Sequence, residues 1–291
     1  MADVVQRLRR LLAEPGLLLM PCCFDGLTAH LVEAAGFPLT FMSGFAVAAA
    51  RLGLPDTGLI SYGEMVEQGR NICSRVSIPV IGDGDTGYGN AVNVKRTVAG
   101  YCQAGFAGVM IEDQVAPKRC GHTRGKQVVQ RHEAIARIRA AVDARNEAGD
   151  LIILARTDAR ATHSLDEALW RARAFADLGA DIVFVEAPRS EEEMRRFCRE
   201  VPGPKLANML EQGATPLLPP ERLEELGYKI ATYPLTLLSS SIRAMQEALV
   251  TLKNGRHPER LLAFDELKTV VGFDDYYREE ERYAAPSGAA E

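Results

Sequence analysis

The sequence lacks the features of a membrane, secreted or nucleic-acid-binding protein. No apolar run approaches the roughly 18 residues that a membrane-spanning helix needs. The N-terminal segment has no apolar signal core followed by a cleavage site. The net charge of -5 leaves no basic excess, which a nucleic acid or an anionic membrane would require. We therefore expect neither as a partner.

Cysteine and histidine are also scarce, and they are not grouped. The six cysteines form no C-x-x-C pair, and a chain of 291 residues does not depend on disulfide bonds for stability. We expect buried, reduced thiols and a cytoplasmic protein. No clustered histidines or cysteines accompany the carboxylates that follow the predicted strands, so nothing favours a zinc site.

The chain instead alternates short apolar runs with longer segments of helical periodicity, such as 133–145 and 165–178. This alternation predicts parallel βαβ units, and eight such strands favour a closed (β/α)8 barrel over an open sheet. The predicted strands cover residues 17–22, 39–43, 80–83, 108–112, 151–157, 182–186, 206–209 and 230–233. Glycines that suit left-handed helix ends precede four of these strands, at Gly36, Gly105, Gly179 and Gly227.

The predicted domain organisation is simple. An amphipathic N-terminal helix should end at Pro15, and residues 1–277 should form one barrel domain that includes the C-terminal helices. Residues 278–291 are charged and then small and polar, so we expect a flexible tail there.

Polar residues follow the predicted strands, at the end of a barrel where active sites are built. Asp83 and Asp85 follow the third run, and Glu112 ends the fourth. Partly buried carboxylates need a counter-charge, and oxygen ligands favour Mg²⁺ or Mn²⁺. We predict a metal at Asp83 and Asp85, with Glu112 and Asp56 in an outer ring. A plain Gly/Asp turn over 82–90 is the alternative. Other polar strand ends are Ser43, Arg156, Glu186 and Asn208.

A short basic loop follows the Glu112 strand. In PKRCGHTRGK, residues 117–126, four basic side chains surround Cys120. Neighbouring cations stabilise a thiolate, and two glycines allow the segment to bend. We predict a mobile lid that brings Cys120 over the metal site. The alternative is a solvated basic loop with an incidental cysteine.

With these segments in place, the sequence resembles the isocitrate lyase and phosphoenolpyruvate mutase superfamily over nearly its whole length. KRCGH is close to the K-[KR]-C-G-H signature of the lyase branch; the mutase and phosphonopyruvate hydrolase branches lack its cysteine. The matching segments are SGFAVAAARLGLPDTG (43–58), GDGDTGYG (82–89), IEDQ (111–114), KRCGH (118–122), ARTDAR (155–160), FVEAP (184–188), ANMLEQG (207–213) and YPL (233–235).

The resemblance implies a barrel whose last helix is exchanged between paired subunits, usually within a homotetramer. It also implies Mg²⁺ and a small 2-hydroxy or 2-oxo carboxylate substrate. Asp83 and Asp85 match the metal positions, with Asp56 and Glu112 acting through water. The implied catalytic residues are Cys120 as acid/base, His122 in the lid and Arg156. The implied substrate-binding residues are Ser43, Gly44, Phe45, Gly121, Arg156, Glu186, Asn208 and Arg243.

Departures from the family pattern bear on the substrate. Tricarboxylate-cleaving members carry an arginine where this chain reads AFDELK (263–268), and methylisocitrate lyases carry a glycine at Phe45. Both differences favour a dicarboxylate with an alkyl group, whereas Glu186 with its nearby proline favours methylisocitrate lyase. Phe41 stands where many relatives have a tyrosine, so the base that takes the hydroxyl proton is assigned to no residue.

We therefore expect an enzyme, an oxo-acid lyase of the carbon–carbon type. It would cleave a 2-alkylmalate or 2,3-dimethylmalate-like acid by retro-aldol chemistry to a 2-oxo acid and a carboxylic acid. The alternatives are a 2-methylisocitrate lyase, an oxaloacetate decarboxylase or hydrolase, and an enzyme similar to carboxyphosphonoenolpyruvate phosphonomutase.

Overall fold

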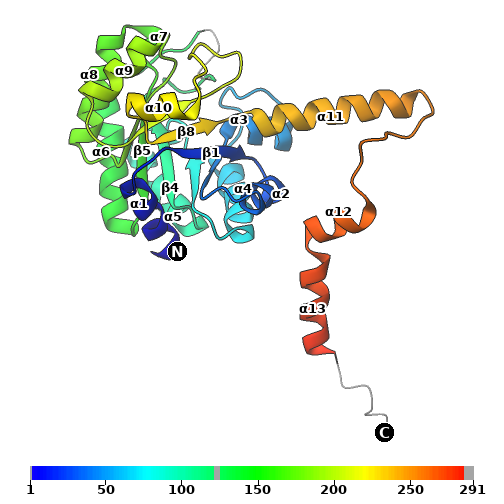
Figure 1. Cartoon of the computed structure of the whole chain (residues 1–291). Helices are drawn as coiled ribbons and strands as arrows, with labels where there is room; N and C mark the ends of the chain where they lie inside the picture. Colours follow the sequence, from blue (N-terminus) through cyan, green and yellow to red (C-terminus); the bar gives the residue numbers. More distant parts are fainter. Residues whose placement is uncertain (1, 121–124, 285–291) are drawn as a thin grey trace. The chain divides into compact units, whose positions relative to one another are not determined.

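The computed structural model describes residues 2–120 and 125–284, in two compact units, Met1–Ser239 and Ser240–Glu291. The first unit is a closed barrel of parallel strands that follow one another in sequence order (Figure 1). The strands are β1 (Leu18–Cys23), β2 (Thr40–Met42), β3 (Val80–Asp83), β4 (Gly108–Glu112), β5 (Ile152–Thr157), β6 (Ile182–Val185), β7 (Lys205–Asn208) and β8 (Ile230–Tyr233). Each predicted run matches a strand to within one residue at either end, so the barrel prediction is confirmed.

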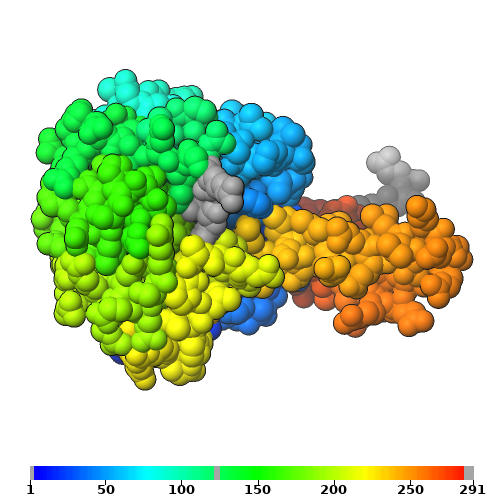
Figure 2. All heavy atoms as spheres, turned by 90° about the horizontal axis from the view of Figure 1, so that it is seen from above, coloured from blue at the N-terminus to red at the C-terminus, as the bar shows by residue number. Residues whose placement is uncertain are grey.

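Helices connect successive strands, and in the first unit the surface follows sequence order around the ring, from blue through green to yellow (Figure 2). The four predicted glycines all have left-handed backbone angles, with φ between 85° and 100°, as helix ends before strands require. The helices of this unit are α1 (Ala2–Ala13), α2 (Gly26–Ala34), α3 (Gly44–Val47), the π-helical turn η1 (Ala48–Leu52), α4 (Tyr62–Arg75), α5 (Ala91–Ala104), α6 (Arg131–Ala148), α7 (Ala159–Thr162), α8 (Leu165–Asp177), α9 (Glu191–Glu200) and α10 (Pro220–Leu226).

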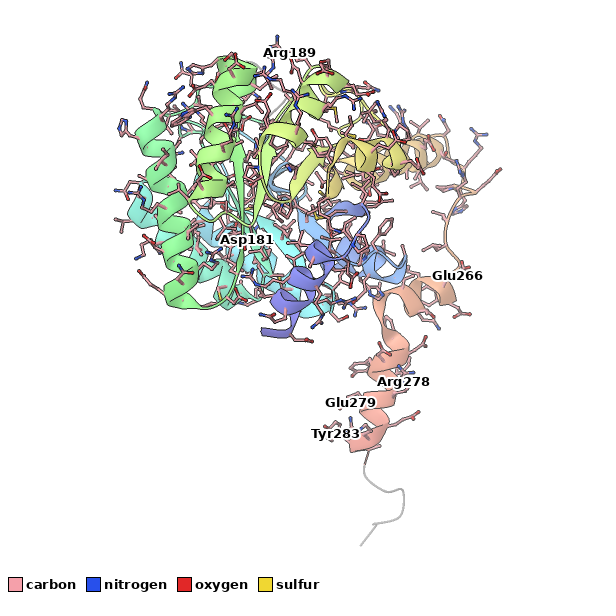
Figure 3. The ribbon with its side chains drawn as sticks, turned by 60° about the vertical axis from the view of Figure 1, so that its left-hand side comes forward. Asp181, Arg189, Glu266, Arg278, Glu279 and Tyr283 are labelled. Atoms are coloured by element: carbon pink, nitrogen blue, oxygen red, sulfur yellow. The ribbon has the colours of Figure 1, made fainter. Side chains whose placement is uncertain are left out.

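Helix α1 closes the N-terminal end of the barrel. Val5 and Leu8 are buried in an apolar cluster with the first residues of several strands, including Ile152 and Ile230. On its polar side, Arg9 donates a hydrogen bond of 3.1 Å to Asp181, which directly precedes β6 (Figure 3). The barrel is therefore sealed at the end opposite the polar strand ends.

The second unit contains the continuation of α11 (Thr236–Lys253), then α12 (Phe264–Val271) and α13 (Phe273–Tyr283). None of the side chains from 240 to 284 is buried. Helix α13 continues past Arg278 to Tyr283, so the expected tail begins inside a helix (Figure 3). Residues 285–291 lie outside the described part of the chain, and the flexibility of the tail stays a prediction. The exposed large apolar residues of the second unit are Ile242, Met245, Leu249, Val250, Leu252, Leu261, Leu262, Phe264, Leu267, Val271, Phe273, Tyr276, Tyr277 and Tyr283.

None of the helices within the described residues combines the length and apolarity needed to cross a membrane.

Candidate active site

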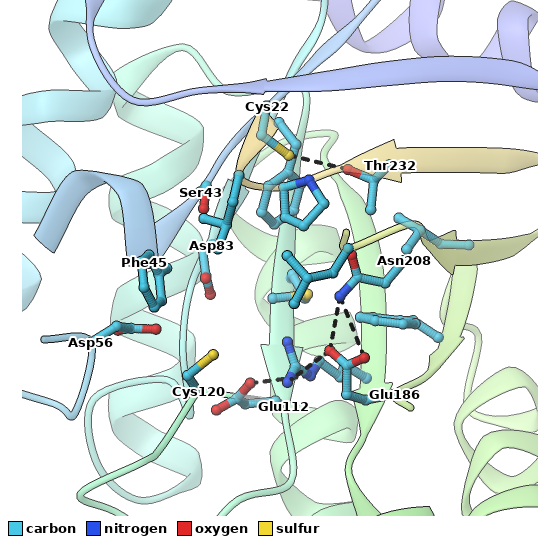
Figure 4. A pocket seen from close by; sticks show the side chains of 18 of the residues that line it. Cys22, Ser43, Phe45, Asp56, Asp83, Glu112, Cys120, Glu186, Asn208 and Thr232 are labelled. Carbon is cyan, nitrogen blue, oxygen red and sulfur yellow. Dashed lines mark hydrogen bonds and ion pairs between the residues drawn. The ribbon is translucent and has the colours of Figure 1, made fainter. Parts of the chain in front are cut away.

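A pocket opens at the C-terminal strand ends, and every strand of the barrel contributes to it directly or through the residues that follow it (Figure 4). One part of the lining is charged and polar, and the other part is apolar. The lining residues are Cys22, Phe41, Ser43, Phe45, Asp56, Asp83, Met110, Glu112, Lys118, Arg119, Cys120, Arg156, Phe184, Glu186, Leu206, Asn208, Leu210, Thr232, Pro234 and Leu235. Most of the residues proposed from the sequence thus meet in one place.

The glycines around Asp83 let β3 pack closely against its neighbours. A β-carbon at Gly82 would lie only 2.7 Å from ring atoms of Tyr101 and Phe106, which stack with their centroids 4.7 Å apart. The Tyr101 hydroxyl donates a 2.6 Å hydrogen bond to the carbonyl of Asp83. Asp85 has a left-handed φ of 49°, and its N–H donates to Asp83 Oδ1 at 3.0 Å. The motif therefore fixes both aspartates rather than forming a plain surface turn.

Lys118 supplies a buried cation to this carboxylate cluster. Its Nζ lies 2.6 Å from Asp56 Oδ2 and 2.8 Å from Asp85 Oδ1, and all three side chains are buried. The sequence indicated Lys118 only as one of several basic residues in a loop. Its role as an internal counter-charge depends on contacts 62 residues apart, which no local pattern reveals.

One lysine does not balance the buried negative charge. Burial raises the pKa of Asp85 to about 7, because desolvation and the nearby Asp83 outweigh the attraction of Lys118. Burial also raises the pKa of Glu112 well above its usual range, although Arg156 lies close by. The ionised forms of these buried carboxylates are therefore unfavourable, and a further cation would stabilise them.

Arg156 joins three acidic side chains at the ends of β4, β5 and β6. Its Nε lies 2.8 Å from Asp158 Oδ2 and 3.4 Å from Glu112 Oε2, and its Nη2 lies 3.1 Å from Glu186 Oε2. Asn208 donates from Nδ2 to the same Glu186 oxygen at 3.2 Å. The structure therefore brings the predicted residues Arg156, Glu186 and Asn208 into one network, in which Arg156 and Glu186 are buried and Asn208 is half-buried.

The Ser43–Gly44 pair lies at the start of α3. Ser43 caps this helix by accepting a 3.3 Å hydrogen bond from the Ala46 N–H. The Gly44 N–H, which the resemblance assigns to a substrate carboxylate, donates here to Asp83 Oδ2 at 3.2 Å. Phe45 follows on the same helix and lines the pocket.

The sulfur of the half-buried Cys120 points into the pocket, whose lining also includes Glu112 (Figure 4). Its two predicted lid neighbours, Gly121 and His122, lie outside the described residues. Arg243 lies on α11 in the second unit, and it is not among the described residues that line the pocket. Its role in substrate binding stays a prediction.

The residues present suit a hard divalent cation. Asp56, Asp83, Asp85 and Glu112 offer only carboxylate oxygens, and Glu112 Oε1 is buried without a hydrogen-bond partner in the described structure. Within residues 2–120 and 125–284, no three acidic, histidine or cysteine side chains form a closed metal cage. Mg²⁺ does not require such a cage, because it commonly binds one or two carboxylates and keeps several waters.

The apolar part of the lining was not predicted, apart from Phe45. Leu210, Pro234 and Leu235 follow β7 and β8, where they line the same pocket as Phe45. They fall in the family-matching segments 207–213 and 233–235, but none of the three was predicted to have a role. Their position directly after strand ends could have indicated one.

Comparison with known proteins identifies the family. The phosphoenolpyruvate phosphomutase family model matches residues 8–253. The chain is 42% identical over 286 residues to 2,3-dimethylmalate lyase of Eubacterium barkeri, covering 97% of this chain and 99% of that protein. The chain belongs to the phosphoenolpyruvate mutase/isocitrate lyase superfamily. It is therefore an enzyme of a superfamily of lyases and mutases.

Relatives with other activities have similar sequence identities. A chloroplastic carboxyvinyl-carboxyphosphonate phosphorylmutase of Arabidopsis thaliana is 42% identical, covering 97% of this chain and 86% of that protein. The 2-methylisocitrate lyase of Aeropyrum pernix is 39% identical, covering 98% of this chain and 91% of that protein.

Two solved structures of the superfamily carry small acids. One is oxaloacetate acetylhydrolase with the inhibitor 3,3-difluorooxalacetate, which has a TM-score of 0.93 and 34% identity and covers 97% of this chain and 98% of that chain. The other is phosphonopyruvate hydrolase with oxalate and Mg²⁺. It has a TM-score of 0.85 and 30% identity, and the match covers 96% of this chain and 98% of that chain.

Proposed function

We propose that this enzyme is a Mg²⁺-dependent carbon–carbon lyase that cleaves a 2-alkylmalate or 2,3-dimethylmalate-like acid to a 2-oxo acid and a carboxylic acid. The observation that carries the proposal is the convergence of Cys120, Arg156 and the Asp83 carboxylate cluster on one pocket. The identity to 2,3-dimethylmalate lyase over nearly the full length of both chains supports it.

The metal would be held by Asp83 and Asp85, with Asp56 and Glu112 binding its waters. The carboxylate chemistry of these residues and the Mg²⁺ in the phosphonopyruvate hydrolase structure support this assignment. When bound, Mg²⁺ supplies positive charge that stabilises an oxyanion developing on the substrate; Mn²⁺ would serve as a substitute.

The chain's own residues account for the remaining chemistry. A base takes the hydroxyl proton as a C=O bond forms, the adjacent C–C bond breaks, and its electron pair stays on the departing acid. The Arg156 guanidinium, held by Asp158 and Glu186, presents positive charge to the substrate oxygens. The Cys120 thiol then gives its proton to the carbanion. His122 lies outside the described residues, and we retain it as a proposed lid contact.

The apolar lining supports an alkyl-bearing substrate. Phe45, Leu210 and Leu235 present hydrocarbon to the pocket, and each buried methylene of a substrate adds about 0.8 kcal/mol of transfer free energy. A third carboxylate facing these side chains would be desolvated without a partner.

Substrate assays separate the alternatives. Pyruvate release from 2,3-dimethylmalate should exceed turnover of 2-methylisocitrate, oxaloacetate and phosphonopyruvate. We expect C120S to lower turnover by at least about 100-fold, the scale of lost acid–base catalysis, while Mg²⁺ binding persists. C102S, which alters a cysteine outside the pocket, is the matched control. Preferred turnover of 2-methylisocitrate or oxaloacetate would replace the alkylmalate assignment, and turnover of a phosphonate alone would reject lyase chemistry.

We also propose that the enzyme is a homotetramer in which paired subunits exchange their C-terminal helices. The exposed apolar residues of α11–α13 support this, because they find no cover within the second unit. The first unit has an apolar groove at α2, β1 and β8, which we propose a second copy of the chain covers. Its lining residues are Leu19, Pro21, Leu31, Val32, Ala35, Phe37, Tyr233, Thr236 and Leu237.

A further inference from the structure

The cations that line the pocket differ in how they are paired. Within the described residues the lining contains three: Lys118, Arg119 and Arg156. Lys118 is buried against Asp56 and Asp85. Arg156 is buried against Glu112, Asp158 and Glu186. Both positive charges are already engaged by carboxylates of the protein.

Arg119 differs from the other two. Its side chain is exposed, and no carboxylate of residues 2–120 or 125–284 lies within ion-pairing distance of it. Its backbone is nevertheless fixed at two points. The Arg119 N–H donates to Gln114 Oε1, and Gln114 Nε2 donates to the Arg119 carbonyl, both at 2.9 Å. Gln114 is only 1% exposed. We call these two hydrogen bonds the Gln114 clamp; they fix the backbone position of Arg119, beside Cys120.

A malate-type substrate carries two carboxylates at opposite ends. One belongs to the future 2-oxo acid, which the metal and Arg156 serve under the proposed function. The other belongs to the departing acid and needs a cation of its own, because a desolvated carboxylate without a partner is costly. The apolar lining at Phe45, Leu210 and Leu235 cannot supply that cation.

We propose that Arg119 binds the second carboxylate of the substrate, the one on the departing acid. This inference rests on the proposed function and adds to it a residue that the sequence did not single out. An arginine suits the task, because its planar fork can donate two parallel hydrogen bonds to a carboxylate.

The position also has a chemical consequence. When the C–C bond breaks, the electron pair left on carbon delocalises into this same carboxylate, whose negative charge therefore increases. A guanidinium that contacts it binds the transition state more tightly than the substrate. Arg119 should therefore affect kcat as well as KM, and Cys120, the next residue, lies where the carbanion is to be protonated.

The test uses the Mg²⁺-loaded full-length enzyme and four variants: R119M, R119K, R243M and the surface control R173M. Two probes are titrated by calorimetry. Oxalate is too short to reach beyond the metal end of the pocket, whereas 2-methylsuccinate carries both carboxylates but lacks the hydroxyl and so cannot be cleaved. Turnover of 2,3-dimethylmalate is measured in parallel. Arg173 lies on α8 and pairs with the exposed end of Glu200, outside the pocket.

We expect R119M to weaken 2-methylsuccinate binding about 10- to 100-fold, the range for a lost charged hydrogen bond, and to lower kcat/KM for 2,3-dimethylmalate by at least as much. Oxalate binding should not change, R119K should recover part of the loss, and R173M should match the wild type. Normal 2-methylsuccinate binding by R119M, or an equal loss of oxalate binding, would overturn the proposal. So would a loss confined to R243M. If the wild type cleaves no malate, the proposed function fails, whereas the binding titrations still decide the role of Arg119.

Discussion

Gly44 and Asp83 are in direct contact, and the contact leaves no room for a side chain at position 44. The Gly44 N–H donates to Asp83 Oδ2 at 3.2 Å, and a β-carbon on Gly44 would lie 2.5 Å from that oxygen. The start of α3 and the end of β3 are thus fitted to each other at the proposed metal site.

Gly44→Ala should therefore displace the Asp83 carboxylate while leaving the barrel folded. We expect Mg²⁺ affinity, measured by calorimetry, to fall about 10- to 100-fold, as an overpacking cost of 1–3 kcal/mol implies. Gly63→Ala is the matched control, since a β-carbon there meets only one atom, at 3.9 Å. Unchanged Mg²⁺ affinity in Gly44→Ala would exclude Asp83 as a ligand.

Cys120 should be the first cysteine to react with iodoacetamide at pH 8. Burial raises the pKa of Cys23 and of Cys198 to about 12, and it raises the pKa of Cys102 less strongly. A raised pKa leaves little thiolate to attack. Peptide mass spectrometry over time gives the order of modification, and oxalate with Mg²⁺ should slow the modification of Cys120 alone. Faster labelling of Cys102 would contradict this order.

Glu167 should contribute stability that is lost in acid. Hydrogen bonds from Arg131 and Arg171 lower its pKa to about 2. A carboxyl with a lowered folded pKa stabilises the fold above its unfolded pKa and loses that contribution as the pH falls towards 2. Because Arg131 is 52% exposed, we expect only about 1 kcal/mol.

Urea unfolding of Glu167→Gln at several pH values measures this contribution. The variant should be less stable than the wild type at pH 7, and the difference should shrink between about pH 4.5 and pH 2. Glu192→Gln makes the same change at a mostly exposed glutamate and should show a smaller effect. A difference that is independent of pH would rule out the charge of Glu167 as its source.

The apolar face of α11 should hold subunits together. Leu249 is 64% exposed within the chain, so Leu249→Glu should place an unpaired charge in the proposed interface and shift the tetramer towards smaller species. Light scattering after size-exclusion chromatography reports the mass. Gln246→Glu adds the same charge at an exposed polar position and controls for charge alone. A wild-type monomer at micromolar concentration would refute the assembly.

The sequence was most informative where function depends on local order. Buried parallel strands need short apolar runs, so the barrel could be predicted. The strand ends then place Asp83, Glu112 and Glu186 at one end of the barrel, so their convergence could be predicted too. The pairing of Lys118 with Asp56 and Asp85 could not, because a basic residue in a loop looks the same whether solvated or buried. The clamp of Gln114 on Arg119 is equally invisible, since it depends on how the loop folds back on its own strand.

The seal formed by α1 at the N-terminal end affects the order of events in catalysis. Cys22, Phe41 and Leu206 line the pocket and also belong to the apolar cluster that contains Val5 and Leu8, so the residues that the structure describes leave no passage through the barrel. Under the proposed lyase reaction, substrate and both products would then share one opening. A 2-oxo acid formed at the depth of Asp83 would leave only after the acid above it had gone. Ordered release should make the 2-oxo acid the product that competes directly with the substrate.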